Sequence, residues 1–238
     1  MTLTGQIFLG VLVLSLLITV IWRLSSRRIS LPCPSWLGWL VELDNPFAKE
    51  HSASSIIQHL DLKSGMRVLD AGCGPGRVTI PLAKAIGAQG EVVAIDTQSR
   101  TLDRVRDRAR VAGLMNISFQ QLALGGNALG KDRFDRALLV TVLGEIPDRE
   151  AALREIHGAL KPGGILSVTE TVFDPHYQSR RVILQLAGSA GFREKDFFGN
   201  RFAFTLHLRR PGEDLEEVTN PDWISKTNTS EDAEMRAQ

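Results

Sequence analysis

Residues 68–79 read VLDAGCGPGRVT, and this stretch is the most informative part of the chain. An apolar strand pattern runs into three glycines at alternating positions, Gly72, Gly74 and Gly76, and a helical pattern follows. Glycine tolerates a positive φ and has no Cβ to hold a ligand away from the main chain. We therefore expect a loop between a buried strand and a helix, shaped so that a ligand lies directly against the backbone.

Strand and helix patterns alternate along the rest of the chain, which indicates a mostly parallel α/β sheet. Strands are expected at residues 66–72, 91–96, 117–122, 134–140, 165–170, 194–198 and 201–209. Helices are expected at 53–59, 77–86, 99–112, 149–160 and 179–190. Ser99 is the expected cap of the third of these, and KPGG (161–164) the turn before the fifth strand. The last two strands lack an intervening helix, so a hairpin reverses one strand.

Composition sets limits on the class of protein. The chain has 238 residues, enough for one sizeable domain, and a formal net charge of +1. It therefore carries no overall basic field that would attract nucleic acid. Cys33 and Cys73 stand far apart in different contexts, so neither a disulfide framework nor a metal site is expected.

Residues 1–24 are expected to form a transmembrane anchor. No charged side chain occurs before Arg23, and about 20 such residues cross a bilayer as a helix. The arginines after the apolar run predict a single-pass membrane protein whose remaining chain lies in the cytoplasm. A cleaved signal peptide and a buried core helix are the alternatives.

The segments that flank the central domain carry further expectations. Residues 25–45 place Trp36 and Trp39 at helical spacing, which is typical of an interfacial helix or of a lid on the domain. Residues 211–238 are polar and acidic, and we expect them to be disordered.

The kind of ligand follows from the spacing of the glycines and from two acids. The spacing is G-x-G-x-G, which differs from the G-x-G-x-x-G of dinucleotide sites. Asp70 precedes the loop and would repel a phosphate but suit a cation. Asp96 ends the second strand, where an acid commonly accepts hydrogen bonds from ribose hydroxyls. A ribose with positive charge and no phosphate fits S-adenosylmethionine better than NAD.

Four motifs together resemble the class I S-adenosylmethionine-dependent methyltransferases, closest to the ubiquinone/menaquinone C-methyltransferase branch. They are VLDAGCGPG (68–76), VVAID (92–96), FDRALLVTVLGEIPD (134–148) and LKPGGILSVTE (160–170). The resemblance covers about residues 46–210. It implies a Rossmann-like, doubly wound sheet of seven strands with the last strand antiparallel.

The resemblance also implies which residues bind S-adenosylmethionine. Asp70 would lie near the methionyl amine and Asp96 would bind the ribose. The chain departs from the family after the third strand, where it reads FQQLALGGN (119–127), so Gln121, Leu122 and Asn127 remain alternatives beside the adenine. The expected cofactor-binding residues are Asp70, Gly72, Cys73, Gly74, Gly76, Asp96, Thr97, Gln121, Leu122 and Val142.

Methyl transfer from a sulfonium is a direct displacement that needs alignment and exclusion of water more than a fixed catalytic motif. The candidate catalytic residues are Glu145, His176, Tyr177 and His51. Glu145 follows the fourth strand, and its structural alternative is a carboxylate at the start of the next helix. His176 and Tyr177 follow the fifth strand, and His51 precedes the first helix in a segment that often folds over the cofactor in the family.

The predicted function is methyl transfer to a small and lipophilic acceptor. A membrane anchor raises the effective concentration of lipid-phase substrates, which favours a quinol precursor, a lipid amine or a thiol. The alternatives are a non-catalytic scaffold that binds S-adenosylmethionine at a membrane and, less compatible with the loop, an NAD-dependent oxidoreductase. No basic stripe with interleaved aromatic residues supports a nucleic-acid substrate.

Overall fold

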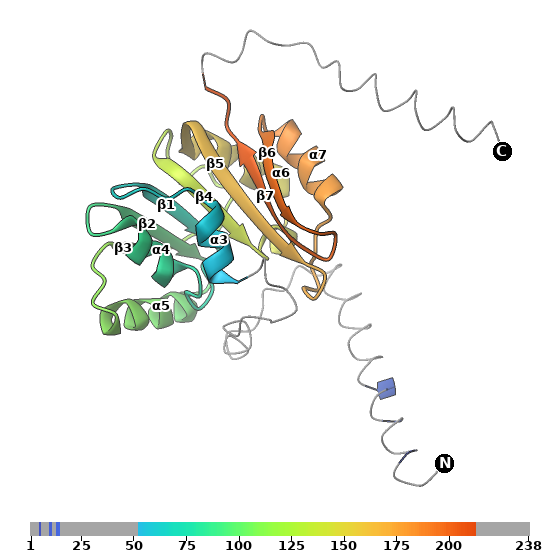
Figure 1. Ribbon diagram of the computed structural model, residues 1–238, viewed down its shortest axis with the longest axis horizontal. Coiled ribbons are helices and arrows are strands. Elements are labelled where there is room, and N and C mark those ends of the chain that lie inside the picture. The colour runs from blue at the N-terminus through green and yellow to red at the C-terminus, as the bar shows by residue number, and fades with distance from the viewer. Residues whose placement is uncertain (1–4, 6–9, 11–12, 15–51, 213–238) are drawn as a thin grey trace, which may run out of the picture.

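The computed structural model describes residues 5, 10, 13, 14 and 52–212 of the chain. Seven strands form one sheet in the order β3-β2-β1-β4-β5-β7-β6 (Figure 1). Their bounds are β1 Arg67–Ala71, β2 Glu91–Asp96, β3 Ile117–Gln121, β4 Phe134–Val140, β5 Leu160–Thr171, β6 Arg193–Gly199 and β7 Ala203–Arg209. Strands β2 and β3 extend the sheet on one side of β1, and the later strands extend it on the other side, so the strand order reverses between β1 and β4.

Helices cover both faces of the sheet, which confirms the doubly wound architecture. The elements are α3 Ala53–His59, α4 Thr79–Ile86, α5 Ser99–Val111, the short η3 Leu143–Glu145, α6 Arg149–Ala159 and α7 Arg180–Ser189. Apolar side chains of α3 and α4 belong to the same buried cluster as Val68 and Leu138, whereas those of α6 and α7 belong to the cluster that contains Leu69 and Leu139. Successive strand residues point to opposite faces, so one strand serves both layers.

The reversed strand predicted from the hairpin is β7. Strands β1 to β5 are parallel, and β7 is antiparallel to both β5 and β6. It lies between them, with Thr171 of β5 opposite Ala203 and Ile165 opposite Arg209. The expectation of seven strands with the last one antiparallel is therefore confirmed, as is the Rossmann-like order of the parallel part.

The expected turn at KPGG is wrong. Strand β5 begins earlier, at Leu160, which is paired with Phe134 of β4. The register then shifts, and Gly163 adopts a φ of +78°. A Cβ on Gly164 would lie 2.8 Å from the Lys161 carbonyl oxygen. The KPGG residues therefore form an irregularity inside a long strand, because the chain leaves α6 already paired with β4.

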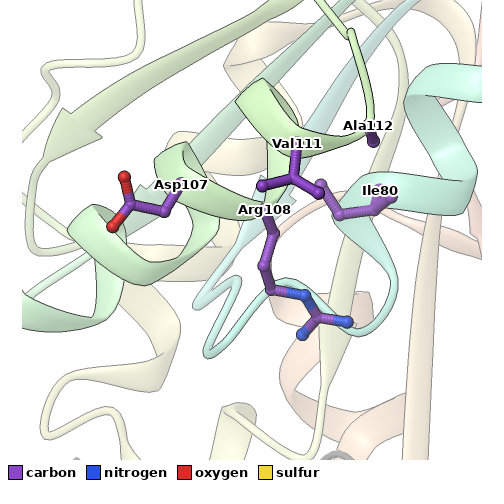
Figure 2. A pocket seen from close by; sticks show the side chains of 5 residues that line it. All are labelled: Ile80, Asp107, Arg108, Val111 and Ala112. Carbon is purple, nitrogen blue, oxygen red and sulfur yellow. The ribbon is translucent and has the colours of Figure 1, made fainter.

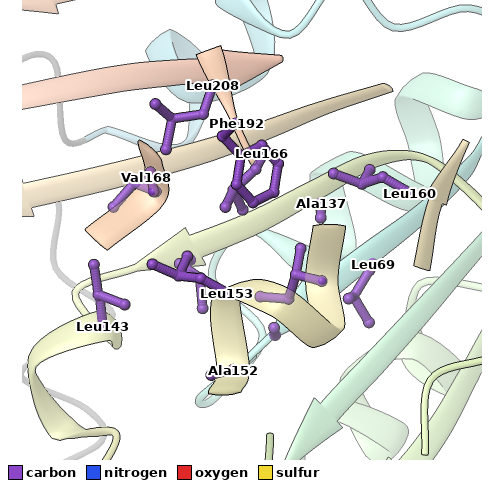
Figure 3. Close-up of a cluster of buried hydrophobic side chains, with 14 of the residues drawn as sticks. Leu69, Ala137, Leu143, Ala152, Leu153, Leu160, Leu166, Val168, Phe192 and Leu208 are labelled. Atoms are coloured by element: carbon purple, nitrogen blue, oxygen red, sulfur yellow. The ribbon is translucent and has the colours of Figure 1, made fainter. Parts of the chain in front are cut away.

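The largest core cluster fills the space between the sheet and helices α6 and α7 (Figure 3). Leu69, Leu153, Leu166 and Phe192 are each at most 5% exposed. Burying a side chain of this size stabilises the fold by about 1.5–3 kcal/mol. This core fixes the strands rigidly, so the loops at their carboxyl ends have defined positions.

Several expectations fall outside the described residues. Most of the predicted anchor (1–24), all of the segment 25–45 and His51 belong to this group, as do residues 213–238 of the tail. Within the described part of the chain, no helix has both the length and the apolar character needed to cross a bilayer.

Candidate functional site

The glycine loop connects β1 to α4 at the carboxyl edge of the sheet, as predicted. Gly72, Gly74 and Gly76 have φ values of +72°, +51° and +83°, which residues with a Cβ rarely adopt. The amides of Gly72 and Cys73 donate to the Ile95 carbonyl oxygen at 2.8 and 3.0 Å. The loop is therefore tied to the end of β2, and the edges of both strands form one surface.

The three glycines serve different purposes. A Cβ on Gly72 would lie 2.6 Å from a Val142 methyl, and a Cβ on Gly76 would lie 2.8 Å from a Val105 methyl. A Cβ on Gly74 would meet no atom within 4 Å. Two glycines thus permit close internal contacts, while Gly74 presents bare backbone to open space. This is a cradle into which a ligand fits against the main chain.

Asp96 closes one side of this cradle. Its Oδ2 accepts a hydrogen bond from the Gly74 amide at 3.1 Å, and its Oδ1 accepts one from the Gln98 amide at 2.8 Å. Partial burial raises the pKa of the Asp96 carboxyl, and these backbone donors oppose that shift. Each carboxylate oxygen retains a second lone pair. Asp96 can therefore accept hydrogen bonds from ribose hydroxyls, the role predicted for it.

Asp70 lies on the other side, at the end of β1. It is 3% exposed, and its Oδ2 accepts a hydrogen bond from the Thr79 hydroxyl at 2.6 Å. Burial, assisted by the charge of Asp96, raises the pKa of Asp70 to about 6, against the lowering effects of Thr79 and Arg77. A cation placed beside a buried carboxylate stabilises its ionised form. A ligand with a positively charged amine and sulfonium fits this carboxylate.

Asp70→Asn is expected to stabilise the ligand-free protein and to weaken binding of S-adenosylmethionine. The pKa of Asp70 is raised in the folded state, so its favourable contribution is complete below pH 3.8 and is lost as the pH rises through about 6. The difference from the ordinary value of 3.8 corresponds to about 3 kcal/mol of lost stability at pH 7.5. Asparagine removes this cost, and denaturant unfolding at pH 4 and pH 7.5 measures it.

Calorimetry provides the second measurement for this variant. Protons compete with the cationic ligand, so wild-type affinity should rise as the pH rises through about 6, and Asp70→Asn should bind at least about tenfold more weakly at pH 7.5 without that pH dependence. Equal affinity of the wild type and Asp70→Asn for S-adenosylmethionine would show that Asp70 does not take part in binding. Thr79→Val is a suitable control, because it removes the hydroxyl donor and keeps the carboxylate.

The structure brings together the residues predicted for the adenosine end. The Gln121 side-chain amide donates to the Thr97 carbonyl oxygen at 3.0 Å, and the Leu122 amide donates to the Asp96 carbonyl oxygen at 3.1 Å. Asn127 has a φ of +59° in the loop that follows β3. Gln121 and Leu122 therefore lie in one corner beside Asp96, and the roles of all three residues toward adenine stay predictions.

Sequence reasoning missed the residue that organises this corner. Glu155 of α6 is 5% exposed, and its carboxylate accepts hydrogen bonds from the amides of Gly125, Ala128 and Leu129. Backbone donors in an irregular loop need such partners when they are buried. The sequence signal that could have indicated this role is Glu155 itself, an acidic residue on the inward face of the helix REAALREIHGA.

The acceptor candidates meet at the ends of β4 and β5. His176 is 6% exposed, and its Nδ1 lies 3.9 Å from both Glu145 Oε1 and Asp174 Oδ1. A Cβ on Gly144 would lie 2.7 Å from the His176 Cβ, so η3 and the loop after β5 are in direct contact. Glu145 and His176 thus belong to one cluster, which their separation in sequence did not reveal.

Tyr177 lies at the margin of this cluster. Its hydroxyl donates to the Arg201 carbonyl oxygen at 2.8 Å. Partial burial raises the pKa of the phenol, and the nearby Glu170 raises it further. The hydroxyl is therefore neutral and already engaged with the hairpin, so the structure favours a positioning role for Tyr177 over proton removal.

A strained residue lies between the two halves of the site. Thr141, directly after β4, has a φ of +55°, which is unusual for a β-branched side chain. Its amide donates to the Thr169 carbonyl oxygen at 2.9 Å, and Val142 follows against Gly72. Backbone strain of this kind concentrates at functional sites. It turns the chain here from the sheet toward both the glycine loop and Glu145.

Cys73 belongs to the glycine loop but does not have the environment of a nucleophile. It is 7% exposed, and burial together with the charges of Asp70 and Asp96 raises the pKa of its thiol. The reactive form of cysteine is the thiolate, which this environment disfavours. In the part of the chain that the structure describes, no group of three or more His, Cys, Asp or Glu side chains is placed to hold a metal ion.

A surface pocket lies between α4 and α5 (Figure 2). Ile80, Asp107, Arg108, Val111 and Ala112 line it, and none of the predicted site residues is among them. The Arg108 guanidinium donates to the Pro75 carbonyl oxygen at 2.7 Å. Arg108 therefore lines this pocket and also fixes the glycine loop through its hydrogen bond to Pro75.

The comparisons with known proteins agree with this geometry. Residues 62–196, more than half of the chain, match the family described as "Methyltransferase domain". The chain belongs to this family, and within it to the class I S-adenosylmethionine-dependent methyltransferases.

Two curated relatives and one solved structure illustrate the similarity. The demethylmenaquinone methyltransferase of Geobacillus stearothermophilus is 27% identical over 72% of this chain and 67% of its own. The ubiquinone/menaquinone biosynthesis C-methyltransferase UbiE of Vibrio vulnificus is 32% identical over 48% of this chain and 45% of its own. A SAM-dependent methyltransferase from Aquifex aeolicus has the same fold, with a TM-score of 0.67 at 20% identity, covering 75% of this chain and 100% of the other. The chain spans about half the length of several curated relatives that it matches.

Proposed function

We propose that this chain transfers the methyl group of S-adenosylmethionine to a small lipophilic acceptor, and that the acceptor is a quinol precursor. The observation that carries the proposal is the pair of acids at neighbouring strand ends. Asp70 and Asp96 flank a glycine loop whose central residue presents only backbone to open space. Bound S-adenosylmethionine supplies a methyl group on a positively charged sulfur, which leaves as a neutral thioether.

The chain's own residues divide the work along the sheet edge. Asp70 supplies negative charge, Asp96 supplies hydrogen-bond acceptors, and the contact between Gly72 and Val142 brings the end of β4 close to the glycine loop. The cluster around His176 lies at the ends of β4 and β5, where it can remove a proton from the acceptor. Alignment of these two halves is the main contribution expected of a methyltransferase.

Two lines of support favour a quinol precursor. The names of the Geobacillus and Vibrio relatives refer to menaquinone or ubiquinone. The apolar sequence of residues 1–24 supports attachment to a membrane, where such lipophilic compounds are concentrated. We propose that this segment anchors the chain with the domain on the cytoplasmic side, a proposal that rests on the sequence of residues 1–28. Reporter fusions at both ends test that orientation.

Calorimetry and a labelling assay test the function. The purified full chain should bind S-adenosylmethionine and its demethylated product. With donor labelled in the methyl group, membrane lipid extracts should yield a labelled lipophilic product. Binding without any labelled small molecule would favour a non-catalytic scaffold, and label found only in protein would contradict a lipophilic acceptor.

A further inference from the structure

Glu170 is the penultimate residue of β5, on the acceptor side of the site, and its environment is unusual for a carboxyl group. The side chain is 1% exposed. Its Oε2 accepts a hydrogen bond from the Gln178 amide at 3.2 Å, while its Oε1 is buried without a hydrogen-bond partner among the described residues. A buried polar atom without a partner costs about 1–3 kcal/mol, so its presence calls for a reason.

The groups around Glu170 are mostly acidic. Asp174 of the following loop and Glu145 of η3 repel a negative charge there, and the charge of Arg149 on α6 opposes this repulsion. Arg149 directs its guanidinium to the carbonyl oxygens of Leu143 and Gly144, at 3.2 and 3.1 Å. It therefore supplies distant charge and no direct salt bridge.

Protonation of Glu170 would remove the repulsion between its carboxylate and the two neighbouring acids. Burial is the largest cause that raises the pKa of Glu170 well above its ordinary value, and the two neighbouring acids add to it. The Tyr177 phenol and the His176 imidazole complete the set of titratable groups in the surrounding loop. Because Oε2 already accepts the Gln178 amide, the proton belongs on Oε1, which then becomes a buried donor without an acceptor.

We propose that Glu170 acts as a neutral carboxylic acid whose Oε1–H donates a hydrogen bond to a phenolic or enolic oxygen of the methyl acceptor. The acid would then favour acceptors that carry an oxygen able to accept this hydrogen bond, and it would orient the ring of the acceptor at the ends of β4 and β5. This inference rests on the proposed function, since it names the class of acceptor that the same site binds.

The alternative class of acceptor is an amine, and the same geometry disfavours it. At pH 7 an alkylamine is mostly an ammonium ion, which has only donors and cannot accept a hydrogen bond from a protonated carboxyl. It would instead stabilise the ionised form of Glu170. The protonation state of Glu170 therefore separates the two classes of substrate.

Infrared spectroscopy of the full-length protein tests the protonation state directly. Wild-type protein at pH 7 should show the carbonyl band of a protonated carboxyl, and this band should shift when only the glutamates carry ¹³C. That label excludes the buried Asp70. Glu170→Gln should remove the band, whereas the matched control Glu194→Gln, at a carboxylate paired with Arg180 on the surface, should leave it unchanged. A wild-type spectrum without a glutamic acid band at pH 7 would overturn the proposal, even if no variant folds.

Ligand binding tests the recognition step. In the presence of S-adenosylhomocysteine, the wild type should bind 1-naphthol, a phenolic probe, and Glu170→Ala should lose about tenfold in affinity or more. Glu170→Gln keeps a donor and should lose less. Unchanged naphthol affinity in Glu170→Ala, or tighter binding of benzylamine than of naphthol by the wild type, would contradict the inference. Failure of the wild type to bind S-adenosylmethionine would instead contradict the proposed function, and the infrared result is independent of it.

Discussion

Gly72→Ala is expected to destabilise the domain by about 2–5 kcal/mol and to abolish measurable binding of S-adenosylmethionine. The new Cβ would lie 2.6 and 2.7 Å from the two Val142 methyl groups, on a backbone with a φ of +72°. Either the loop or the strained segment after β4 must move, and both form the cradle. Denaturant unfolding and calorimetry measure the two effects.

Gly74→Ala is the matched control for this variant. Its Cβ meets nothing within 4 Å, so the variant bears only the cost of a positive φ, about 1–2 kcal/mol. It should nevertheless bind the ligand weakly, because the methyl group occupies the space over the backbone. Adding Val142→Ala should restore part of the stability lost in Gly72→Ala but not in Gly74→Ala. Equal losses of stability in the two glycine variants would contradict the assigned contact.

Glu155→Gln is expected to lower the free energy of unfolding by about 2–4 kcal/mol and the affinity for S-adenosylmethionine by about tenfold. The carboxylate accepts three backbone N–H groups of the loop after β3, at 2.5 to 3.1 Å. Glutamine offers one acceptor oxygen, and its NH₂ group would face a backbone donor. The loop beside Asp96 would lose its fixed shape.

Glu150→Gln on the same helix controls for the loss of charge. Glu150 is exposed and pairs with Arg154 at 3.3 Å, so its replacement should change stability by less than about 0.5 kcal/mol. Thermal unfolding of both variants provides the comparison. Comparable destabilisation by the two substitutions would show that Glu155 acts through helix charge and not through the loop.

Local patterns were sufficient to predict the elements of the fold and to single out the glycine loop and the two acids that flank it. The glycine spacing, the position of Asp96 after a strand and the hairpin without a helix are all local features. Gly87 and Gly113 follow α4 and α5 with φ values of +69° and +66°, as glycines after helices commonly do. The capping role expected for Ser99 is wrong: the helix cap is Gln98, whose amide bonds to Asp96, so Ser99 lies inside the first turn.

The corner beside Asp96 and the acceptor half depended on contacts between distant residues. Glu155 and Gly125 are 30 residues apart, and Gly144 meets His176 only once β4 and β5 are paired. The sequence marked Glu145 and His176 as separate candidates with no indication that they meet. The role proposed for Glu170 rests on its burial and on the lack of a hydrogen-bond partner for its Oε1, and only the three-dimensional structure provides these two observations. Such features belong to tertiary structure and leave little trace in composition or spacing.

The insertion of β7 between β5 and β6 has a consequence for biosynthesis. A nascent chain that has emerged from the ribosome only as far as β6 has completed the nucleoside cradle, yet the edge of β5 still exposes its backbone donors and acceptors. An open strand edge invites pairing with other chains. Premature termination before Ala203 should therefore produce an aggregating fragment, and chaperones that shield unfinished sheets should engage the chain until its last strand is translated.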